Sequence, residues 1–299
     1  MTDPPPISDA RRLIVGCGYL GERVASRWLT RRDAVFATTR SPTRAEAFAA
    51  AGIRPLVGDV TASAGSPSRL PELPDVDTVL WAVGFDRSAT ASYRDVHVAG
   101  LARLLDSLPG RPRVIFISST GVWGDDGGST VTESTPPSPS REAGRVLVEA
   151  ERLLQQHRLG PGIAVRLAGL YGPGRLPRLA DLQAGRPLAA DPESWLNLIH
   201  VDDAADVVCG LADLPAPQPL YVVSDGRPLR RRDWYEGLAR LANCPPPRWS
   251  PTASRSRGGD KRVDPRQVWT DLGRGPVAAD PLLAVGRLLA SQVERPARG

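Results

Sequence analysis

Lysine is almost absent from this chain of 299 residues: Lys261 is the only one among 38 basic residues. Any chemistry that needs a lysine amine therefore has a single residue to supply it. Cysteine is also scarce, and Cys17, Cys209 and Cys244 lie far apart in the sequence. Their spacing matches neither a disulfide framework nor a metal site, which predicts a cytoplasmic protein that holds no metal.

Long apolar runs and gathered positive charge are missing as well. No stretch approaches the roughly 20 apolar residues of a membrane-spanning helix, and residues 1–12 lack the apolar region of a signal peptide. The net charge is +5, but basic runs such as Arg230-Arg231-Arg232 are short, scattered and without interleaved aromatic residues. We therefore predict no membrane or nucleic-acid partner. The positive net charge suits binding of a phosphorylated small molecule.

A glycine motif follows the first apolar run, Leu13 to Val15, and precedes a helical pattern that continues through Leu29. A strand, a Gly-x-Gly-x-x-Gly turn and a helix in this order are the context of a dinucleotide-binding fingerprint. The first glycine permits the tight turn, the second lets backbone N–H groups approach a pyrophosphate, and the third allows close helix–strand packing. The helix N-terminus adds partial positive charge. The alternative is a glycine-rich turn without a ligand. The residues predicted to bind the cofactor here are Gly16, Cys17, Gly18, Tyr19, Leu20 and Gly21.

Strand and helix patterns alternate through the first half of the chain. Further strands are expected at 34–39, 54–57, 78–83, 114–118 and 162–167, most of them separated by helical patterns. This alternation predicts an α/β fold with a doubly wound parallel sheet. After Leu167 glycine and proline interrupt the pattern, and only short strands remain. We predict a Rossmann domain over residues 1–168 and a smaller C-terminal lobe over 169–299, whose strands near 195–201 and 220–223 either stay in the lobe or return to the main sheet.

The end of the second strand bears on the choice of dinucleotide. NAD-preferring folds place an acidic residue there to bond the ribose 2′-OH, whereas this chain has Thr39, Arg40 and Ser41. An arginine and a serine can hold a 2′-phosphate by charge-assisted hydrogen bonds. NADP(H) is therefore favoured over NAD(H), unless Arg40 is merely exposed. Asp59, after the third strand, is placed either to bond the adenine amino group or to cap a turn.

Five stretches, taken together, carry a family resemblance. They are Gly16 to Gly21, Gly58-Asp59-Val60, Val114 to Gly124 (VIFISSTGVWG), Arg166 to Arg175 (RLAGLYGPGR) and Asn197 to Ala204 (NLIHVDDA). In order and content they resemble the extended short-chain dehydrogenase/reductase superfamily, the NAD(P)-dependent epimerase/dehydratase group. The GxGxxG spacing, in place of the family's usual GxxGxxG, points to its atypical members.

The resemblance implies a Rossmann sheet of about seven strands, a C-terminal substrate lobe and a cofactor over the carboxyl ends of the strands. It implies that Ser119 hydrogen-bonds the substrate oxygen, with Thr120 as the nearby substitute; the alternative for Ser119 is a strand-ending serine that bonds backbone. It also implies a homodimer through the helices 93–108 and 141–157. The remaining residues predicted to contact the cofactor are Val60, Ala82, Val83, Gly84 and Ser118.

The chain departs from the family at its proton-transfer pair. Relatives carry Tyr-x-x-x-Lys on the helix after the fifth strand, where the tyrosine exchanges a proton and the lysine lowers its pKa. Here Ala143 and Leu147 occupy that register, and the only lysine lies elsewhere. Arg145 cannot be assumed to replace the pair because a guanidinium stays protonated; contact with phosphate or ribose is its predicted role.

Nearby side chains are the candidates to replace the missing tyrosine–lysine pair. His97 stands where many relatives have an asparagine, and it is predicted either to titrate in catalysis or to serve as a structural hydrogen-bonder. Tyr93 lies one turn earlier on the same face and belongs either to the core or to the substrate pocket. Tyr171 is predicted either to act on the substrate or to pack under the nicotinamide. The residues predicted to line the substrate pocket are Trp123, Tyr93, Arg175 and Trp195.

Three functions remain open at this point. The first is an NADP(H)-dependent oxidoreductase that acts on a small-molecule carbonyl or alcohol with a substituted proton donor. The second is a redox-neutral epimerase, dehydratase, isomerase or cyclase that kept the fold. The third is a non-catalytic NADP(H) sensor. Fold alone does not decide among them.

Overall fold

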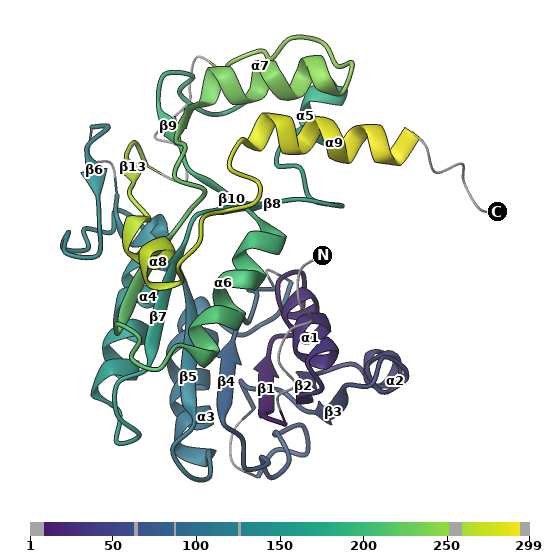
Figure 1. The fold of residues 1–299 in the computed structure, drawn as a ribbon, viewed down its shortest axis with the longest axis vertical. Helices are drawn as coiled ribbons and strands as arrows, with labels where there is room; N and C mark the ends of the chain where they lie inside the picture. Colours follow the sequence, from purple (N-terminus) through teal and green to yellow (C-terminus); the bar gives the residue numbers. More distant parts are fainter. Residues whose placement is uncertain (1–8, 63–64, 87, 125–126, 251–258, 294–299) are drawn as a thin grey trace. The chain divides into compact units, whose positions relative to one another are not determined.

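The computed structural model describes residues 9–62, 65–86, 88–124, 127–250 and 259–293. A seven-stranded sheet lies at its centre in the order β11-β7-β5-β4-β1-β2-β3, and Figure 1 shows β5, β4 and β1 side by side. The pairs β1–β2, β2–β3, β1–β4 and β4–β5 are parallel. The predicted Rossmann fold is therefore confirmed. The strands are β1 (Arg11–Val15), β2 (Ala34–Thr39), β3 (Arg54–Val57), β4 (Thr78–Trp81), β5 (Arg113–Ser119), β7 (Ile163–Leu167) and β11 (Leu220–Val223).

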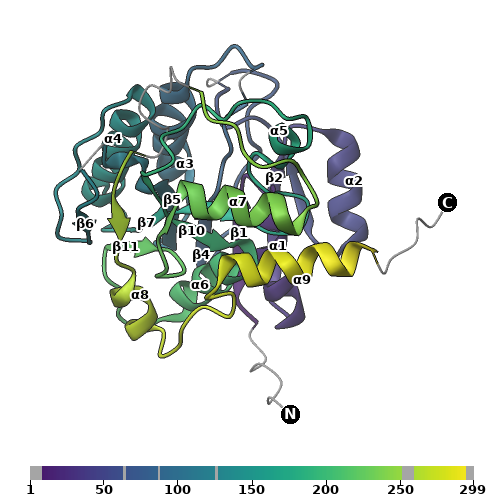
Figure 2. The ribbon, with the colours of Figure 1, turned by 90° about the horizontal axis from the view of Figure 1, so that it is seen from above.

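The central strands are continuous apolar runs because helices cover both faces of the sheet. Leu13, Ile14 and Val15 of β1 have no exposed surface. In Figure 2, α3 and α4 lie on one face of the sheet and α1 and α6 on the other. Arg27 on α1 forms an ion pair with Asp206 on α6. These helices and their neighbours are α1 (Gly21–Thr30), α2 (Pro42–Ala50), α3 (Leu101–Ser107), α4 (Glu142–Gln156) and α6 (Val201–Asp213).

The helix expected over 93–108 is not uniform. Its middle is a π-helix, η1 (Asp95–Gly100), which continues directly into α3. π-helical turns are rare and occur frequently at functional sites. Apolar spacing alone does not separate a π-turn from an α-turn, so this one was not predictable from the sequence.

The chain divides into two compact units, each built from three separate segments. Unit 1 comprises residues 1–118, 142–165 and 205–220, and unit 2 comprises residues 119–141, 166–204 and 221–299. That residues 1–168 bind the cofactor and residues 169–299 form the substrate lobe stays a prediction. Of the two short strands expected after Leu167, the one at Leu220–Val223 joins the main sheet as β11.

The strand expected over 195–201 is broken in two at Asn197. β9 (Trp195–Leu196) pairs with β12 (Leu229–Arg230), and β10 (Leu198–His200) pairs with β8 (Gly169–Tyr171). The Asn197 side chain donates to the Lys261 carbonyl at 2.9 Å and accepts from the Val263 N–H at 2.8 Å. This side chain thus bonds the backbone around β13 (Arg262–Val263), and the two strands on either side of it pair with different partners.

Unit 2 has an apolar core of its own. Tyr171, Trp234 and Leu238 are fully buried in it. The loop expected over 124–139 contains a short strand, β6 (Thr130–Val131), which pairs with β13. The remaining elements of this unit are η2 (Thr120–Val122), α5 (Leu179–Gln183), α7 (Arg231–Leu241), α8 (Arg266–Asp271) and α9 (Pro281–Val293).

Two kinds of feature are missing from the described residues. None of the helices there combines the length and the apolar character that crossing a bilayer requires. In that same part of the chain, no three His, Cys, Asp or Glu side chains are grouped so that they could hold a metal ion.

Candidate functional site

The glycine turn after β1 has a different steric environment at each glycine. Gly16 has φ +86°, and a Cβ there would lie 2.5 Å from the Val83 Cα, so no side chain fits. A Cβ at Gly21 would lie 3.0 Å from the Gly16 carbonyl oxygen. A Cβ at Gly18 would meet no atom within 4 Å. The turn is therefore crowded at Gly16 and Gly21 and has open space beside Gly18, where a side chain would project.

The helix that follows this turn begins without a side-chain cap. Leu20 stands at the N-cap of α1 and makes no side-chain capping hydrogen bond. The Glu22 N–H donates to the Gly18 carbonyl and the Arg23 N–H to the Leu20 carbonyl, so it is the positive end of the helix dipole that favours an anion here. The open face of Gly18 and the uncapped N-terminus of α1 together fit the pyrophosphate of a dinucleotide.

Arg40 at the end of β2 is paired with acidic residues. Its Nη2 lies 3.1 Å from Asp86 Oδ2, and its Nη1 lies 3.9 Å from Asp59 Oδ2. More than half of the Arg40 side chain, 56%, is exposed. Its predicted companions make local bonds: Ser41 caps α2 by accepting from the Arg44 N–H, and Thr39 Oγ1 accepts from the Ser41 N–H. Arg40 is thus the charged group at this strand end that a 2′-phosphate would meet.

Two charged partners in this region were not predicted from the sequence. Asp86 follows β4 and pairs with Arg40, as described above. Arg44, on α2, donates to the Cys17 carbonyl at 2.7 Å and also pairs with Glu22 on α1. Arg44 thereby connects α2 to the glycine turn. An arginine three residues after an N-cap serine is a weak signal, and Asp86 has no motif that marks it.

Asp59 fulfils one of the two roles left open for it. Its Oδ1 accepts hydrogen bonds from the Thr61 N–H and the Thr61 hydroxyl, both at 2.7 Å, so it caps a turn. The carbonyl of the next residue, Val60, accepts two hydrogen bonds from Arg103 on α3, at 3.0 and 3.2 Å. These contacts fix the backbone directly after β3, where the adenine is predicted to lie.

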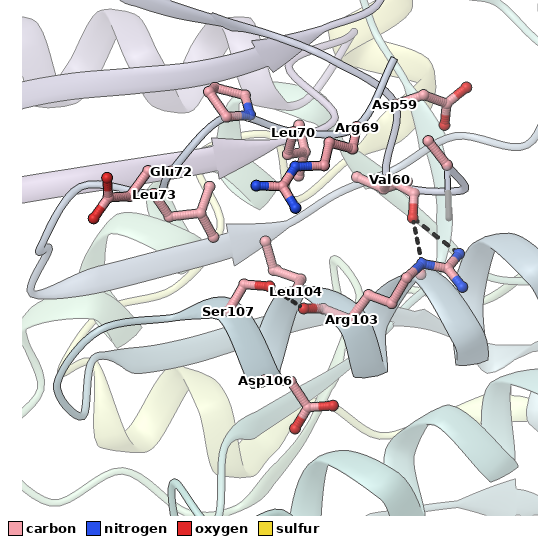
Figure 3. Close-up of a pocket in the computed structure, with 13 residues that line it drawn as sticks. Asp59, Val60, Arg69, Leu70, Glu72, Leu73, Arg103, Leu104, Asp106 and Ser107 are labelled. Carbon is pink, nitrogen blue, oxygen red and sulfur yellow. Dashed lines mark hydrogen bonds between the residues drawn. The ribbon is translucent and has the colours of Figure 1, made fainter. Parts of the chain in front are cut away.

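A cavity of about 470 Å³ lies between the segment that follows β3 and helix α3. Figure 3 shows Arg103 reaching from α3 to the Val60 carbonyl on one side of it, with Leu104 directed toward the opposite segment. Leucine side chains and charged groups line it together, among them Arg69 and Glu72. None of the predicted catalytic residues lines this cavity. Its place beside Asp59 and Val60 puts it next to the predicted adenine end of the site.

His97 and Tyr93 come together on the helix that contains the π-turn. Their ring centroids are 4.3 Å apart, and Phe85 packs edge-on against Tyr93 at 5.1 Å. His97 is 4% exposed, and its Nδ1 is buried without a hydrogen-bond partner among the described residues. Burial lowers the pKa of His97 to about 4. The imidazole is therefore neutral at pH 7, which suits a hydrogen bond to a ligand better than proton donation from an imidazolium.

Helix α4 carries a buried carboxylate one turn beyond the position of the missing lysine. Ser118, on β5, donates to Glu151 Oε1 at 2.6 Å, and both side chains are buried. Leu147 is also buried. Arg145 is exposed and pairs with Glu142 on the same helix. The Ser118 hydroxyl is therefore committed to a contact between β5 and α4.

In unit 2, Ser119 ends β5 and is the N-cap of the short helix η2. Its Oγ accepts from the Gly121 N–H at 3.0 Å. A serine hydroxyl that accepts one bond can still donate its proton. The observed bond to backbone therefore leaves both interpretations of Ser119 open. Thr120 is the first residue of η2.

Three of the other predicted residues of unit 2 are packed against neighbours. Trp123 is 1% exposed, with its Nε1 donating to the Thr135 carbonyl and the Arg166 guanidinium over its ring. Tyr171 has no exposed surface, and burial raises the pKa of its hydroxyl far above the usual value. Trp195 lies under the Arg230 guanidinium at 3.9 Å. Tyr171 packs edge-on against His200 and Trp234, and both of its predicted roles toward a ligand stay predictions.

Two basic residues of unit 2 remain to be placed: Arg175, which is predicted to line the substrate pocket, and Lys261, the only lysine of the sequence. Arg175 is exposed, in a tight turn whose backbone pairs with Gly172. Lys261 is 1% exposed and donates to the Trp123 carbonyl at 3.1 Å. The only lysine of the chain thus holds a backbone carbonyl.

The comparisons with known proteins identify the family. The model of the NAD dependent epimerase/dehydratase family matches residues 13–223. The chain is 32% identical over 276 residues to Protein YeeZ of Escherichia coli (strain K12), which covers 90% of this chain and 97% of that protein. This chain belongs to the NAD-dependent epimerase/dehydratase family.

Two solved structures extend this comparison. A conserved protein of unknown function from Silicibacter pomeroyi DSS is 26% identical, with a TM-score of 0.75 over 95% of this chain and 99% of that one. The Bordetella bronchiseptica enzyme WbmG, in complex with NAD and UDP, is 17% identical, with a TM-score of 0.73 over 95% and 96%. At that identity WbmG shows a shared fold.

Proposed function

We propose that this protein binds NADP(H) and oxidises or reduces a small-molecule alcohol or carbonyl with a substituted proton donor. The observation that carries the proposal is the glycine turn, which is sterically closed at Gly16 and Gly21 and open above Gly18. Membership of the family and the NAD held by WbmG support a nicotinamide dinucleotide. Arg40 at the end of β2 supports the phosphorylated form.

The roles of the chain's own residues follow from this assignment. Gly18 and the N-terminus of α1 would hold the pyrophosphate, and Arg40 the 2′-phosphate. The cofactor supplies hydride transfer when bound, and the protein supplies orientation and electrostatics. Ser119 is proposed to donate a hydrogen bond to the reacting oxygen. His97, neutral and buried, is proposed to hydrogen-bond the ligand or an ordered water.

A second candidate is a redox-neutral epimerase or dehydratase, which the family and the UDP bound by WbmG favour. The alanine and leucine at the tyrosine–lysine register on α4 favour the third, a sensor without turnover. A homodimer through the helices 93–108 and 141–157 stays a prediction, as does the cytoplasmic location.

The reaction is tested by mixing purified protein with NADPH and a panel of carbonyl compounds while absorbance at the nicotinamide band is followed. We expect NADPH oxidation with at least one carbonyl, and Ser119→Ala to lower that rate by about tenfold or more with cofactor affinity kept. Product formation without net oxidation would support the redox-neutral enzyme instead. Tight NADPH binding without any turnover would support the sensor.

Cofactor choice is tested separately, by titration with NADPH and NADH. The intact protein should bind NADPH more tightly, because the 2′-phosphate gains a charge-assisted hydrogen bond from Arg40. Arg40→Ala should reduce the ratio of NADPH affinity to NADH affinity by roughly tenfold, which is the contribution of one such hydrogen bond. Equal affinity of the intact protein for NADPH and NADH would remove the assignment to NADP(H).

A further inference from the structure

The ion pair between Arg40 and Asp86 crosses the end of β1. Arg40 follows β2 and Asp86 follows β4, and these two strands flank β1 in the sheet. The glycine turn begins where β1 ends, at Gly16. In an open α/β sheet a dinucleotide binds outside the carboxyl ends of the strands, where the strand order reverses. The pair therefore spans the strand ends over which the cofactor is predicted to lie.

Asp86 uses its two carboxylate oxygens for different partners. Oδ1 accepts from the Ser88 N–H at 3.0 Å and from the Ser88 hydroxyl at 2.6 Å, which fixes the loop after β4. Oδ2 is the oxygen that faces Arg40, at 3.1 Å. Arg40 meets a second carboxylate, Asp59, at 3.9 Å. A 2′-phosphate that binds Arg40 thus approaches two carboxylates, and it competes with Asp86 Oδ2 for the Nη2 donor of the guanidinium.

We propose that Asp86 competes with the cofactor's 2′-phosphate for Arg40, and that this competition sets how strongly the protein prefers NADP(H) over NAD(H). This inference rests on the proposed function, since it takes NADP(H) as the cofactor. Without a 2′-phosphate, Arg40 keeps Asp86 as its partner. With one, the phosphate accepts from Arg40, and the Asp86 carboxylate is left as a like charge nearby, which opposes binding.

The test is the variant Asp86→Asn, which removes the charge and keeps an oxygen that can accept from Ser88. Affinities are measured by calorimetric titration with NADPH, NADH, 2′,5′-ADP and 5′-AMP, so no turnover is needed. We expect NADPH and 2′,5′-ADP to bind roughly two- to fivefold more tightly than to the intact protein, the size of an exposed ion pair. NADH and 5′-AMP should change by less than that.

Asp95→Asn is the matched control. Asp95 Oδ2 accepts from the Ser92 N–H at 2.9 Å and the Ser92 hydroxyl at 2.7 Å, the same pattern that Asp86 makes with Ser88. Asp95 carries the same charge, but its carboxylate bonds Ser92 rather than Arg40. Asp95→Asn should leave all four affinities unchanged. In an Arg40→Ala background, Asp86→Asn should have a smaller effect on NADPH affinity, because the competition for Arg40 is gone and only the repulsion between the Asp86 carboxylate and the phosphate remains.

Three outcomes would overturn the role of Asp86. The first two are an unchanged NADPH affinity in Asp86→Asn and a weaker one. The third is an equal gain in NADPH affinity in Asp95→Asn, which would show that the gain comes from the change in net charge alone. Each is compatible with an intact protein that still prefers NADPH. An intact protein without that preference would contradict the proposed function itself, so the two failures are distinguishable.

Discussion

Gly18→Ala is expected to weaken dinucleotide binding by about a hundredfold while the protein stays folded. The added Cβ meets no protein atom within 4 Å, so the folded state has room for it. That same open space is where the cofactor's pyrophosphate has to approach the backbone N–H groups. A hundredfold loss corresponds to about 2.7 kcal/mol. Calorimetric titration with NADPH measures the affinity, and urea unfolding measures the stability.

Two other glycines serve as controls for this variant. A Cβ at Gly275 would also meet no atom within 4 Å, and Gly275 lies outside the predicted site. Gly275→Ala should change neither stability nor affinity. Gly16→Ala should lower stability instead, because Gly16 has a positive φ and its Cβ would overlap the Val83 backbone. NADPH binding by Gly18→Ala at the affinity of the intact protein would contradict a pyrophosphate site above Gly18.

Below pH 6.5 the protein is expected to lose stability because of His97. Burial lowers the pKa of His97 from 6.5 to about 4 in the folded state. The unfolded chain therefore binds a proton, below pH 6.5, that the folded chain does not, and stability falls as the pH falls toward 4. At pH 5 the loss attributable to His97 is about 2 kcal/mol, from about 1.4 kcal/mol per pH unit.

The matched variant for this prediction is His97→Asn, which keeps a polar side chain but does not titrate. Urea unfolding at pH 7.5 and pH 5 gives the free energy of unfolding of both proteins. Acidic residues titrate in both and cancel in the difference. The intact protein should lose about 2 kcal/mol more than His97→Asn between the two pH values. Equal losses would show that His97 is accessible to protons in the folded protein.

The parts of the fold that sequence predicts well are those set by neighbouring residues. The strands at 34–39, 54–57 and 220–223 have the bounds that the sequence predicts, because apolar runs between glycine, proline and charged residues define them locally. The turn at Gly16 is predictable for the same reason, since the order of strand, glycines and helix is contained in one short stretch. The number of strands, seven, follows from the family resemblance.

Features that depend on distant residues are not predictable in this way. Asn197 breaks a strand because its side chain bonds the backbone at Lys261 and Val263, more than 60 residues away. Arg40 is predicted at a strand end, but its ionic partner Asp86 lies 46 residues later in a loop without a motif. Burial of Tyr171 and His97, and with it the shift of their pKa values, depends on tertiary packing that spacing does not encode.

The most direct test of a dinucleotide site at the glycine turn is a crystal structure of the protein grown with excess NADPH. We expect the pyrophosphate above Gly18 at the N-terminus of α1, with the 2′-phosphate bonded to Arg40 in place of Asp86. A structure in which the glycine turn is closed by the protein's own side chains, with NADPH bound elsewhere or not at all, would contradict this site and the function proposed from it.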